Sequence, residues 1–273
     1  MSYRLFEGKD HASVYQKYRF VPPEEVKDLI LQYLDNKREG QPLGLAVDLG
    51  CGTGQLSRLL APHFQDLVGL DISEGQLEEA RAVQGYPNVT YRLGTAEDLP
   101  FADNSVDLLA ASSAAHWFQQ QLFLAEAKRV LKPRGCIALV GFGDDNVHLQ
   151  SQDCGDRLTR IYNEVREVLL PYTSSQVPVA TSKLQELFAA IPFPDKQRVE
   201  SIQVRHGVSV RALVGFIESW SMFQTYRRTQ PTAAQHLLHD TLNRILEEIG
   251  AESADTELEL HMDYFCILAS KPQ

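Results

Sequence analysis

The chain has 273 residues, enough to bury a full hydrophobic core without disulfide or metal staples. It carries 26 Lys and Arg against 36 Asp and Glu, a formal charge of −10, which argues against nucleic acid or an anionic membrane as a partner. Its four cysteines lack a CxxC spacing, its first residues are charged, and no apolar run approaches the roughly 18 residues of a membrane span. We therefore expect no metal–thiolate site, no signal peptide and a cytoplasmic location.

Helical and strand patterns alternate from residue 24 to residue 142. Apolar residues recur at helical spacing in 24–35, 55–61 and 122–131. Short apolar runs predict five strands, at 45–49, 66–71, 89–93, 106–111 and 136–142. Ser73, followed three residues later by Gln76, predicts a helix that starts with a capping box. This alternation predicts a parallel, doubly wound α/β sheet that binds ligands at the carboxyl ends of its strands.

The remainder of the chain is mostly helical by its pattern. Residues 144–197 are expected to be helical, a strand is expected at 199–206, and helices are expected near 213–220 and 238–249. Residues 257–269 predict a final strand that returns to the sheet. We expect the helices after the fifth strand to form a lid rather than an independent domain.

The segment VDLGCGTGQLS, residues 47–57, places glycines at positions 50, 52 and 54 directly after a strand. Position 55 is Gln, so the dinucleotide-binding pattern GxGxxG fails at its last glycine. Asp48 would repel a pyrophosphate but attract a cation, and S-adenosylmethionine carries a sulfonium and an ammonium group without phosphate. Asp71, at the end of the second strand, can accept both ribose hydroxyls, and Ile72 can lie against adenine.

Four ordered motifs extend this interpretation: VDLGCGTG, GLDIS, GTAEDLPFADNSVDLLAASSAAHWF and RVLKPRG. Over residues 44–142 and the final strand, the chain resembles class I S-adenosylmethionine-dependent methyltransferases. The resemblance implies a Rossmann-like α/β fold with a doubly wound, mostly parallel seven-stranded sheet and a helical lid insertion. Its implied organisation is an N-terminal cofactor-covering segment, 1–23, a core of 24–143 with 257–273, and a lid with late core elements, 144–256.

The resemblance also implies which positions hold the cofactor. The methionine end is expected at Asp48, Gly50, Gly52, Thr53, Gly54, Ser112 and Ser113, the ribose and adenine at Asp71 and Ile72, the adenine edge at Thr95, Ala96 and Glu97, and a cover at Tyr18 and Arg19. Asp98 is the alternative to Glu97 for the adenine amine. Two positions depart from the family: Thr95 stands where Asp is frequent, and Arg134 where Gly is usual.

The identity of the methyl acceptor is less specified. FEGKDHASVYQKYRF, with His116-Trp-Phe118, is similar to the group that includes trans-aconitate methyltransferases, so a small molecule is expected, with a carboxylic acid as one candidate. A carboxylate needs no base but a cation, for which Arg19, Arg157 and Arg160 are candidates. A hydroxyl or amine would use a base, and His116 is the first candidate, unless it only caps the next helix. A protein methyltransferase and a non-catalytic cofactor-binding regulatory subunit remain alternatives; no metal is expected, and the oligomeric state is not specified.

Overall fold

The computed structural model describes residues 6, 8–143, 147–151, 154–174, 182 and 184–273. Internal contacts divide the chain into two compact units. The first unit comprises residues 1–19, 143–177 and 203–263, and the second comprises residues 20–142, 178–202 and 264–273. The sequence-based division into a covering segment, a core and a lid stays a prediction.

A mostly parallel sheet is built from eight strands within the described residues. These are β1 (Leu45–Leu49), β2 (Asp66–Asp71), β3 (Val89–Leu93), β4 (Val106–Ser112), β5 (Leu131–Phe142), β6 (His148–Gln150), β7 (Asp195–Ser209) and β8 (Glu257–Ser270). The order is β3-β2-β1-β4-β5-β8, with both β6 and β7 paired to β8. Strands β1 to β5 pair in parallel, and β8 is antiparallel to β5. The predicted doubly wound, seven-stranded sheet is therefore confirmed, with the three-residue β6 added.

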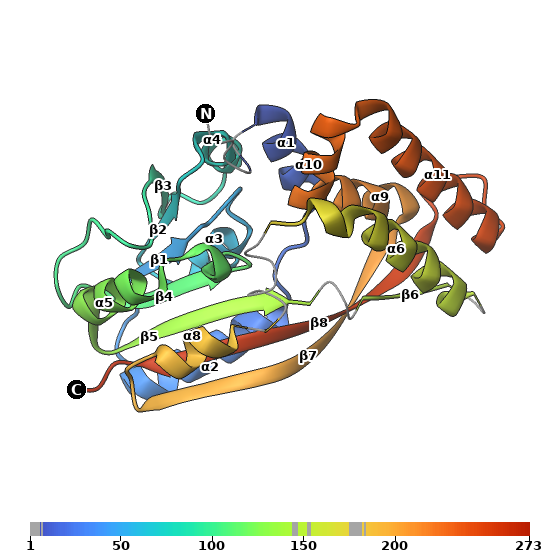
Figure 1. Ribbon diagram of the computed structural model, residues 1–273. Helices are drawn as coiled ribbons and strands as arrows, with labels where there is room; N and C mark the ends of the chain where they lie inside the picture. Colours follow the sequence, from blue (N-terminus) through green and yellow to red (C-terminus); the bar gives the residue numbers. More distant parts are fainter. Residues whose placement is uncertain (1–5, 7, 144–146, 152–153, 175–181, 183) are drawn as a thin grey trace. The chain divides into compact units, whose positions relative to one another are not determined.

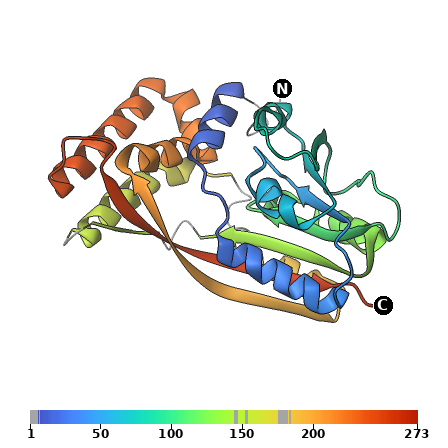
Figure 2. The same ribbon diagram turned by 180° about the vertical axis from the view of Figure 1, so that it is seen from behind.

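The helices of the second unit cover both faces of its sheet. They are α2 (Glu24–Arg38), α3 (Gln55–Leu60), α4 (Glu74–Ala82), α5 (Gln120–Val130) and α8 (Gln185–Ala190), with 3-10 turns at Ala61–His63 and Ala115–Trp117. Helices α5 and α8 lie on the near face in Figure 1, and α2 lies on the opposite face, seen from behind in Figure 2. Phe123 of α5 and Leu187 of α8 are fully buried in one cluster with Leu109 of β4. Each such side chain contributes about 1.5–3 kcal/mol through burial.

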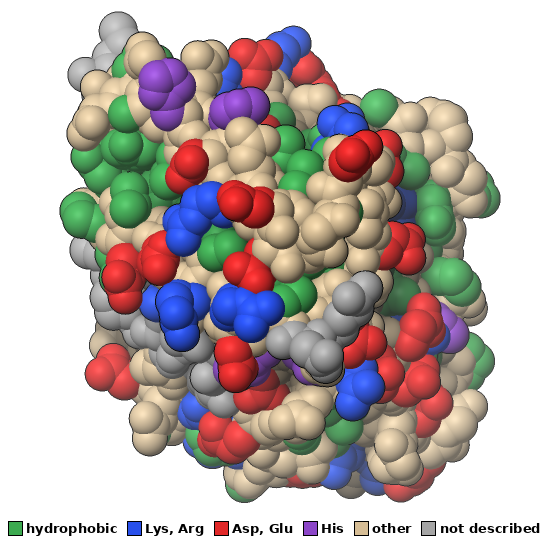
Figure 3. Space-filling view, turned by 90° about the vertical axis from the view of Figure 1, so that its right-hand side faces the viewer, with side chains coloured by type: hydrophobic (Ala, Val, Ile, Leu, Met, Phe, Trp, Pro, Cys, Tyr) green, Lys and Arg blue, Asp and Glu red, His purple; other side chains and the backbone are tan. Residues whose placement is uncertain are grey.

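The first unit is mostly helical, and it also contains β6 and parts of β7 and β8. Its helices are α1 (Lys9–Tyr18), α6 (Gly155–Leu169), α9 (Val210–Glu218), α10 (Ser221–Thr229) and α11 (Pro231–Ile249), with a 3-10 turn at Leu170–Tyr172. Trp220 packs edge-on against Tyr162 of α6 and Phe216 of α9, with ring centroids 5.5 and 5.7 Å away. On the face shown in Figure 3, acidic and basic side chains are interspersed. No helix in the described ranges is long and apolar enough to cross a membrane.

Most predicted elements of the second unit are confirmed, but several elsewhere were not anticipated. The first five strands and the helices at 24–35, 55–61 and 122–131 are present close to their predicted ends, except that β5 begins at Leu131 rather than at residue 136. The segment 144–197 is only partly helical, because it also contains β6. Helices α1 and α10 were missed. Both are short, with β-branched or aromatic residues inside, so packing on neighbouring helices outweighs their weak local preference.

Arg134, which stands where the family usually has Gly, has the backbone conformation of a glycine. Its φ of 64° is left-handed, a conformation that glycine adopts without strain and other residues adopt at a cost. The side chain pairs with Glu39 at 2.6 Å, and the backbone N–H donates to Lys271 at 2.9 Å. The turn therefore keeps the backbone that a glycine would favour, held by a hydrogen bond and an ion pair.

Candidate active site

The Gly-rich loop connects β1 to α3 through three glycines with positive φ. Gly50, Gly52 and Gly54 have φ values of 63°, 54° and 85°. A Cβ on Gly50 would lie 2.6 Å from the Ala114 Cβ, and a Cβ on Gly54 would overlap the Tyr91 hydroxyl. At Gly50 and Gly54, both space and backbone conformation therefore require glycine. The N–H of Gly54 donates to Cys51 O at 2.9 Å, which tightens the loop before α3.

Asp71 anchors this loop from the end of β2. One carboxylate oxygen accepts from Gly52 N at 2.8 Å, and the other accepts from Ser73 N at 2.9 Å. Ser73 caps α4, since its hydroxyl accepts from Gln76 N at 3.2 Å. The capping-box prediction is half wrong, because Asp71, not the Gln76 side chain, occupies Ser73 N. Each Asp71 oxygen retains a lone pair, so the carboxylate can still accept two hydroxyls.

Asp48, at the end of β1, is a buried acid with few partners. It is 1% exposed, and its Oδ2 accepts from Ser57 Oγ at 2.6 Å. Its Oδ1 has no hydrogen-bond partner among the described residues. Burial raises the pKa of Asp48 to about 7. A carboxyl group in this state can accept a proton or a nearby cation at neutral pH.

Two apolar side chains stand exposed where β2 and β3 end. Ile72 is 51% exposed and Leu93 is 61% exposed, and Leu93 pairs in register with Asp71. Exposed side chains of this size offer a flat apolar surface to an aromatic ring. Ile72 was expected to face adenine. Leu93 was missed, because only its exposure distinguishes it from an ordinary strand residue.

The predicted adenine edge lies in the loop after β3. Thr95 is exposed and forms an isolated backbone bridge with Asp98. Ala96 is 5% exposed. Glu97 accepts from Gln119 N at 2.8 Å, which ties this loop to the start of α5. The other Glu97 oxygen remains available to an amine, so the preference for Glu97 over Asp98 stays a prediction.

The end of β4 and the Gly-rich loop carry the remaining predicted residues of this unit. Ser112 ends β4, and Ser113 follows with a φ of 52°, held by its N–H to Val140 O at 2.8 Å. Non-glycine residues in this conformation are strained, and such strain concentrates at functional sites. His116 lies against Trp117, with ring centroids 4.8 Å apart. Thr53 is fully buried and donates to Gln55 Oε1 at 2.9 Å.

The two predicted covering residues belong to the other unit. The Tyr18 ring fills the space beside Gly215, where a Cβ would lie 2.5 Å from it. The Arg19 guanidinium lies 4.8 Å from the Tyr15 ring centroid and 5.2 Å from that of Phe216. This fixes a cation between two aromatic faces. Their assignment to the cofactor stays a prediction.

His11 is a buried polar residue on α1. Its Nε2 lies 2.9 Å from the Ser219 carbonyl, and burial lowers its pKa to about 4. The ring is therefore neutral at pH 7, with Nε2 as the donor.

The structure thus brings the predicted residues of the second unit to one edge of the sheet, in the carboxyl-end position that parallel strands require. It adds Ser57, Tyr91 and Leu93, which sequence reasoning missed. Ser57 could have been found from helical spacing, since it follows Gly54 by one turn. In the described part of the chain, no group of three or more His, Cys, Asp or Glu side chains could hold a metal ion.

Comparisons with known proteins agree with this geometry. Residues 47–139 match a protein family described as "Methyltransferase domain". The chain is 36% identical over 225 residues to the uncharacterised methyltransferase Mb3374 of Mycobacterium bovis. The matched region spans 82% of this chain and 82% of that protein. It is 38% identical over 109 residues to the malonyl-[acyl-carrier protein] O-methyltransferase of Methylococcus capsulatus. That match spans 38% of this chain and 40% of that protein.

A solved structure from Anaeromyxobacter dehalogenans, assigned to the type II methyltransferases, is similar over 100% of both chains. The TM-score is 0.68 and the sequence identity is 21%, so this likeness concerns the fold.

Proposed function

Because the chain belongs to the class I S-adenosylmethionine-dependent methyltransferases, we propose that it transfers the cofactor's methyl group to a small-molecule acceptor. The observation that carries the proposal is the arrangement of two acids around the Gly-rich loop. Asp71 holds Gly52 N at 2.8 Å and keeps lone pairs free, while Asp48 keeps one buried oxygen without a partner. This donor and acceptor set fits a cofactor with a sugar and a positive charge.

Each residue has a defined task in this proposal. Asp71 accepts from the ribose hydroxyls, Ile72 and Leu93 face the adenine ring, and Glu97 accepts from its amine. Asp48 supplies negative charge near the methionine end. The cofactor, when bound, supplies a methyl group already activated on a positively charged sulfur. The protein then has to position the acceptor and exclude water.

The same acids disfavour a nicotinamide cofactor. A pyrophosphate at this helix start would face Asp48 and Asp71, and no lysine or arginine replaces the missing third glycine at Gln55. S-adenosylmethionine carries no phosphate and avoids this repulsion.

The acceptor class is supported from two sides. The relative from Methylococcus is named for O-methylation of a malonyl group, although it matches only 38% of this chain. The N-terminal segment with Asp10, His11 and Tyr15 is similar to that of the trans-aconitate methyltransferase group. Both favour a small acid or a related small molecule, methylated on oxygen.

Arg19 is the strongest of the three arginines considered for holding such a carboxylate. Arg157 already pairs with Glu248, and Arg160 is exposed. Arg19 is held between the rings of Tyr15 and Phe216, which leaves its N–H edges to a ligand. If the acceptor is instead a hydroxyl or an amine, His116 is the candidate base.

The test is a labelling experiment with the purified chain. A metabolite extract is incubated with the protein and S-adenosylmethionine that carries a deuterated methyl group, and products are identified by mass spectrometry. We expect a small-molecule product three mass units heavier than its unlabelled form, formed by the wild type and lost in Asp71→Ala. Labelled protein in place of a labelled metabolite would indicate a protein methyltransferase. Cofactor binding without any labelled product across the extract would indicate a non-catalytic subunit.

A further inference from the structure

Asp48 receives its one side-chain hydrogen bond from a residue that lies one helical turn beyond the Gly-rich loop. Ser57 of α3 is fully buried, and its hydroxyl donates to Asp48 Oδ2 at 2.6 Å. A serine has one O–H donor, and the Ser57 hydroxyl donates it to the Asp48 carboxylate. Ser57 is too deeply buried to be an ordinary surface helix residue, and its hydroxyl does not serve the helix backbone.

The groups that face Asp48 come from every neighbouring element. Asp71 at the end of β2 repels its charge, and Arg58 of α3 attracts it. Cys51 of the loop and Tyr91 of β3 are uncharged at neutral pH, since burial raises the pKa of each. Ser57 therefore favours the ionised carboxylate through both its hydroxyl and its backbone N–H, and the hydroxyl makes the larger contribution.

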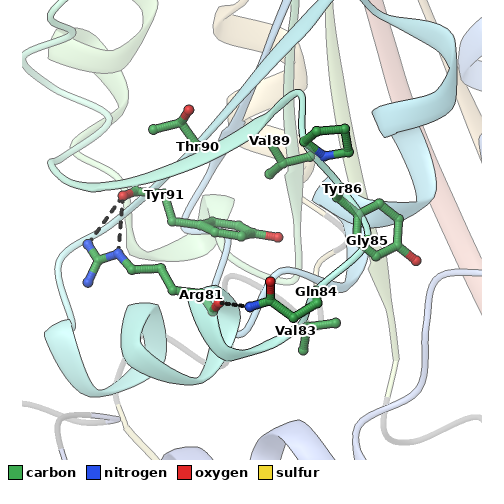
Figure 4. Close-up of a pocket in the computed structure, with 9 residues that line it drawn as sticks. Arg81, Val83, Gln84, Gly85, Tyr86, Val89, Thr90 and Tyr91 are labelled. Atoms are coloured by element: carbon green, nitrogen blue, oxygen red, sulfur yellow. Dashed lines mark hydrogen bonds between the residues drawn. The ribbon is translucent and has the colours of Figure 1, made fainter.

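Tyr91 closes this cluster on the outer side. Its ring fills the space beside Gly69, where a Cβ would lie 2.6 Å from Cδ1 and 2.9 Å from Cys51 Sγ. Tyr91 also lines a surface pocket of about 560 Å³, together with Arg81 and Gln84. Figure 4 shows the Tyr91 ring projecting among these residues, with Val89 and Thr90 on its far side. Tyr91 therefore contacts both the pocket and the buried residues Gly54 and Gly69.

We propose that Ser57 is a positioning residue that sets the protonation state of Asp48, and that Tyr91 keeps water away from this pair. The proposal rests on the proposed cofactor and concerns how its charge is recognised. An ionised Asp48 attracts the positively charged sulfur of S-adenosylmethionine, but gains little from the neutral sulfur of S-adenosylhomocysteine, which is otherwise the same ligand. The Ser57 hydroxyl stabilises the ionised form, and exclusion of water by Tyr91 destabilises it.

The experiment measures the affinity of both ligands by isothermal titration calorimetry between about pH 5.5 and about pH 9. The quantity followed is the ratio of the two dissociation constants, which isolates the sulfur charge. In the wild type the preference for S-adenosylmethionine should rise with pH, with a midpoint near the pKa of about 7 for Asp48. In Ser57→Ala the midpoint should move up by about one to two pH units, because a hydrogen bond to the charged form is lost.

Tyr91→Ala should move the midpoint in the opposite direction. Removing the ring admits water from the pocket, which lowers the cost of ionising Asp48. Ser57→Thr keeps the hydroxyl and should restore the wild-type midpoint. The matched control is Ser219→Ala, which also removes a fully buried hydroxyl, one that donates to Phe216 O at 2.6 Å in the other unit. Its midpoint should equal that of the wild type.

The outcomes separate this proposal from the proposed function. If neither ligand binds the wild type, the proposed function is wrong. If both bind but the midpoint in Ser57→Ala stays within about 0.3 pH units of the wild type, Ser57 has only a structural role and the proposal is overturned. If Ser57→Ala unfolds too readily for titration, Tyr91→Ala decides: a midpoint below that of the wild type supports the proposal, and an unchanged or higher midpoint overturns it.

Discussion

Asp107 and Asp48 lie on adjacent strands of one sheet and are almost equally buried, at 0% and 1% exposure, yet their surroundings differ. Asp107, near the start of β4, contacts Arg38 Nη2 at 2.8 Å and Lys132 Nζ at 2.7 Å. It also accepts from the backbone N–H groups of residues 44 and 45, at 3.1 and 2.9 Å. Asp48, at the opposite edge, has one serine hydroxyl and one oxygen without a partner in the described chain.

This difference distinguishes a structural acid from a binding acid. A buried carboxylate is tolerated when cations and N–H groups surround it, as they do at Asp107. A buried carboxylate with an unpartnered oxygen costs stability, and such a group is typical of sites where a ligand supplies the missing partner. We therefore assign Asp107, at the amino edge of the sheet, a structural role, and we propose Asp48, at the carboxyl edge, as part of the binding site.

The largest effect is expected at the amino edge. Asp107→Ala leaves Arg38 buried without its partner and should lower the free energy of unfolding by about 3–5 kcal/mol, measured by urea denaturation. Asp66→Ala, an exposed acid at the start of β2, should change stability by less than about 0.5 kcal/mol. The molecules of Asp107→Ala that stay folded should bind S-adenosylmethionine as the wild type does. Loss of affinity without loss of stability would reverse the roles of the two edges.

The next effect is on binding at the carboxyl edge. Asp71→Ala removes the acceptor for two ribose hydroxyls, and two charge-assisted hydrogen bonds of about 1.5 kcal/mol each correspond to roughly a 100-fold weaker affinity. Titration calorimetry with S-adenosylmethionine measures this loss, and Asp66→Ala again serves as the control. An unchanged dissociation constant would mean that Asp71 only anchors Gly52 and Ser73.

The third effect is the pH dependence of Asp48. Burial raises its pKa from 3.8 to about 7, so the folded protein binds this proton more tightly than the unfolded chain between those values. The free energy of unfolding should therefore fall as pH rises through this window. A cationic cofactor favours the ionised acid, so its affinity should rise about tenfold from about pH 6 to about pH 8.

Asp48→Asn cannot ionise and should flatten both profiles, in urea denaturation and in calorimetry. A wild type whose stability and affinity are both independent of pH in this range would show that Asp48 does not titrate there.

The smallest effect concerns the turn at the amino edge. Arg134→Gly relieves the left-handed φ of 64° but loses the ion pair with Glu39 and adds freedom to the unfolded chain. These contributions nearly cancel, so the free energy of unfolding should change by less than about 1 kcal/mol, measured by urea denaturation. Arg134→Ala keeps the strain without the ion pair and should be less stable than Arg134→Gly. The reverse order would show that backbone strain at this turn is negligible.

The sequence predicts the second unit well because its signals are local. Strand 45–49, its acid and its glycines are contiguous, and parallel strands bring their carboxyl ends to one edge. Contacts made at long range could not be predicted. Arg38 reaches Asp107 from a helix 69 positions away, because the packing of α2 against β5 places it there. In the sequence, nothing distinguishes Tyr91 from an ordinary strand residue. Its contacts with Gly54 and Gly69 arise only when the strands pair in the sheet.

The second half of the capping box, in which the Gln76 side chain accepts from Ser73 N, was wrong for a similar reason. Gln76 has the right spacing to reach Ser73 N, but Asp71 reaches that N–H from the strand end at 2.9 Å. Spacing in the sequence alone does not show which of two nearby acceptors, Asp71 or Gln76, receives the hydrogen bond from Ser73 N. In the other unit, Tyr18 and Arg19 were selected by resemblance, and local pattern does not specify their ligand.

The central claim is that a cationic sulfur cofactor binds between the two carboxyl-edge acids. A crystal structure of the protein with S-adenosylmethionine tests this most directly. We expect the ribose hydroxyls within hydrogen-bond distance of the Asp71 carboxylate and the methionine end at the Gly-rich loop, on the side of Asp48. Density for the cofactor elsewhere, or ribose hydroxyls turned away from Asp71, would contradict the account.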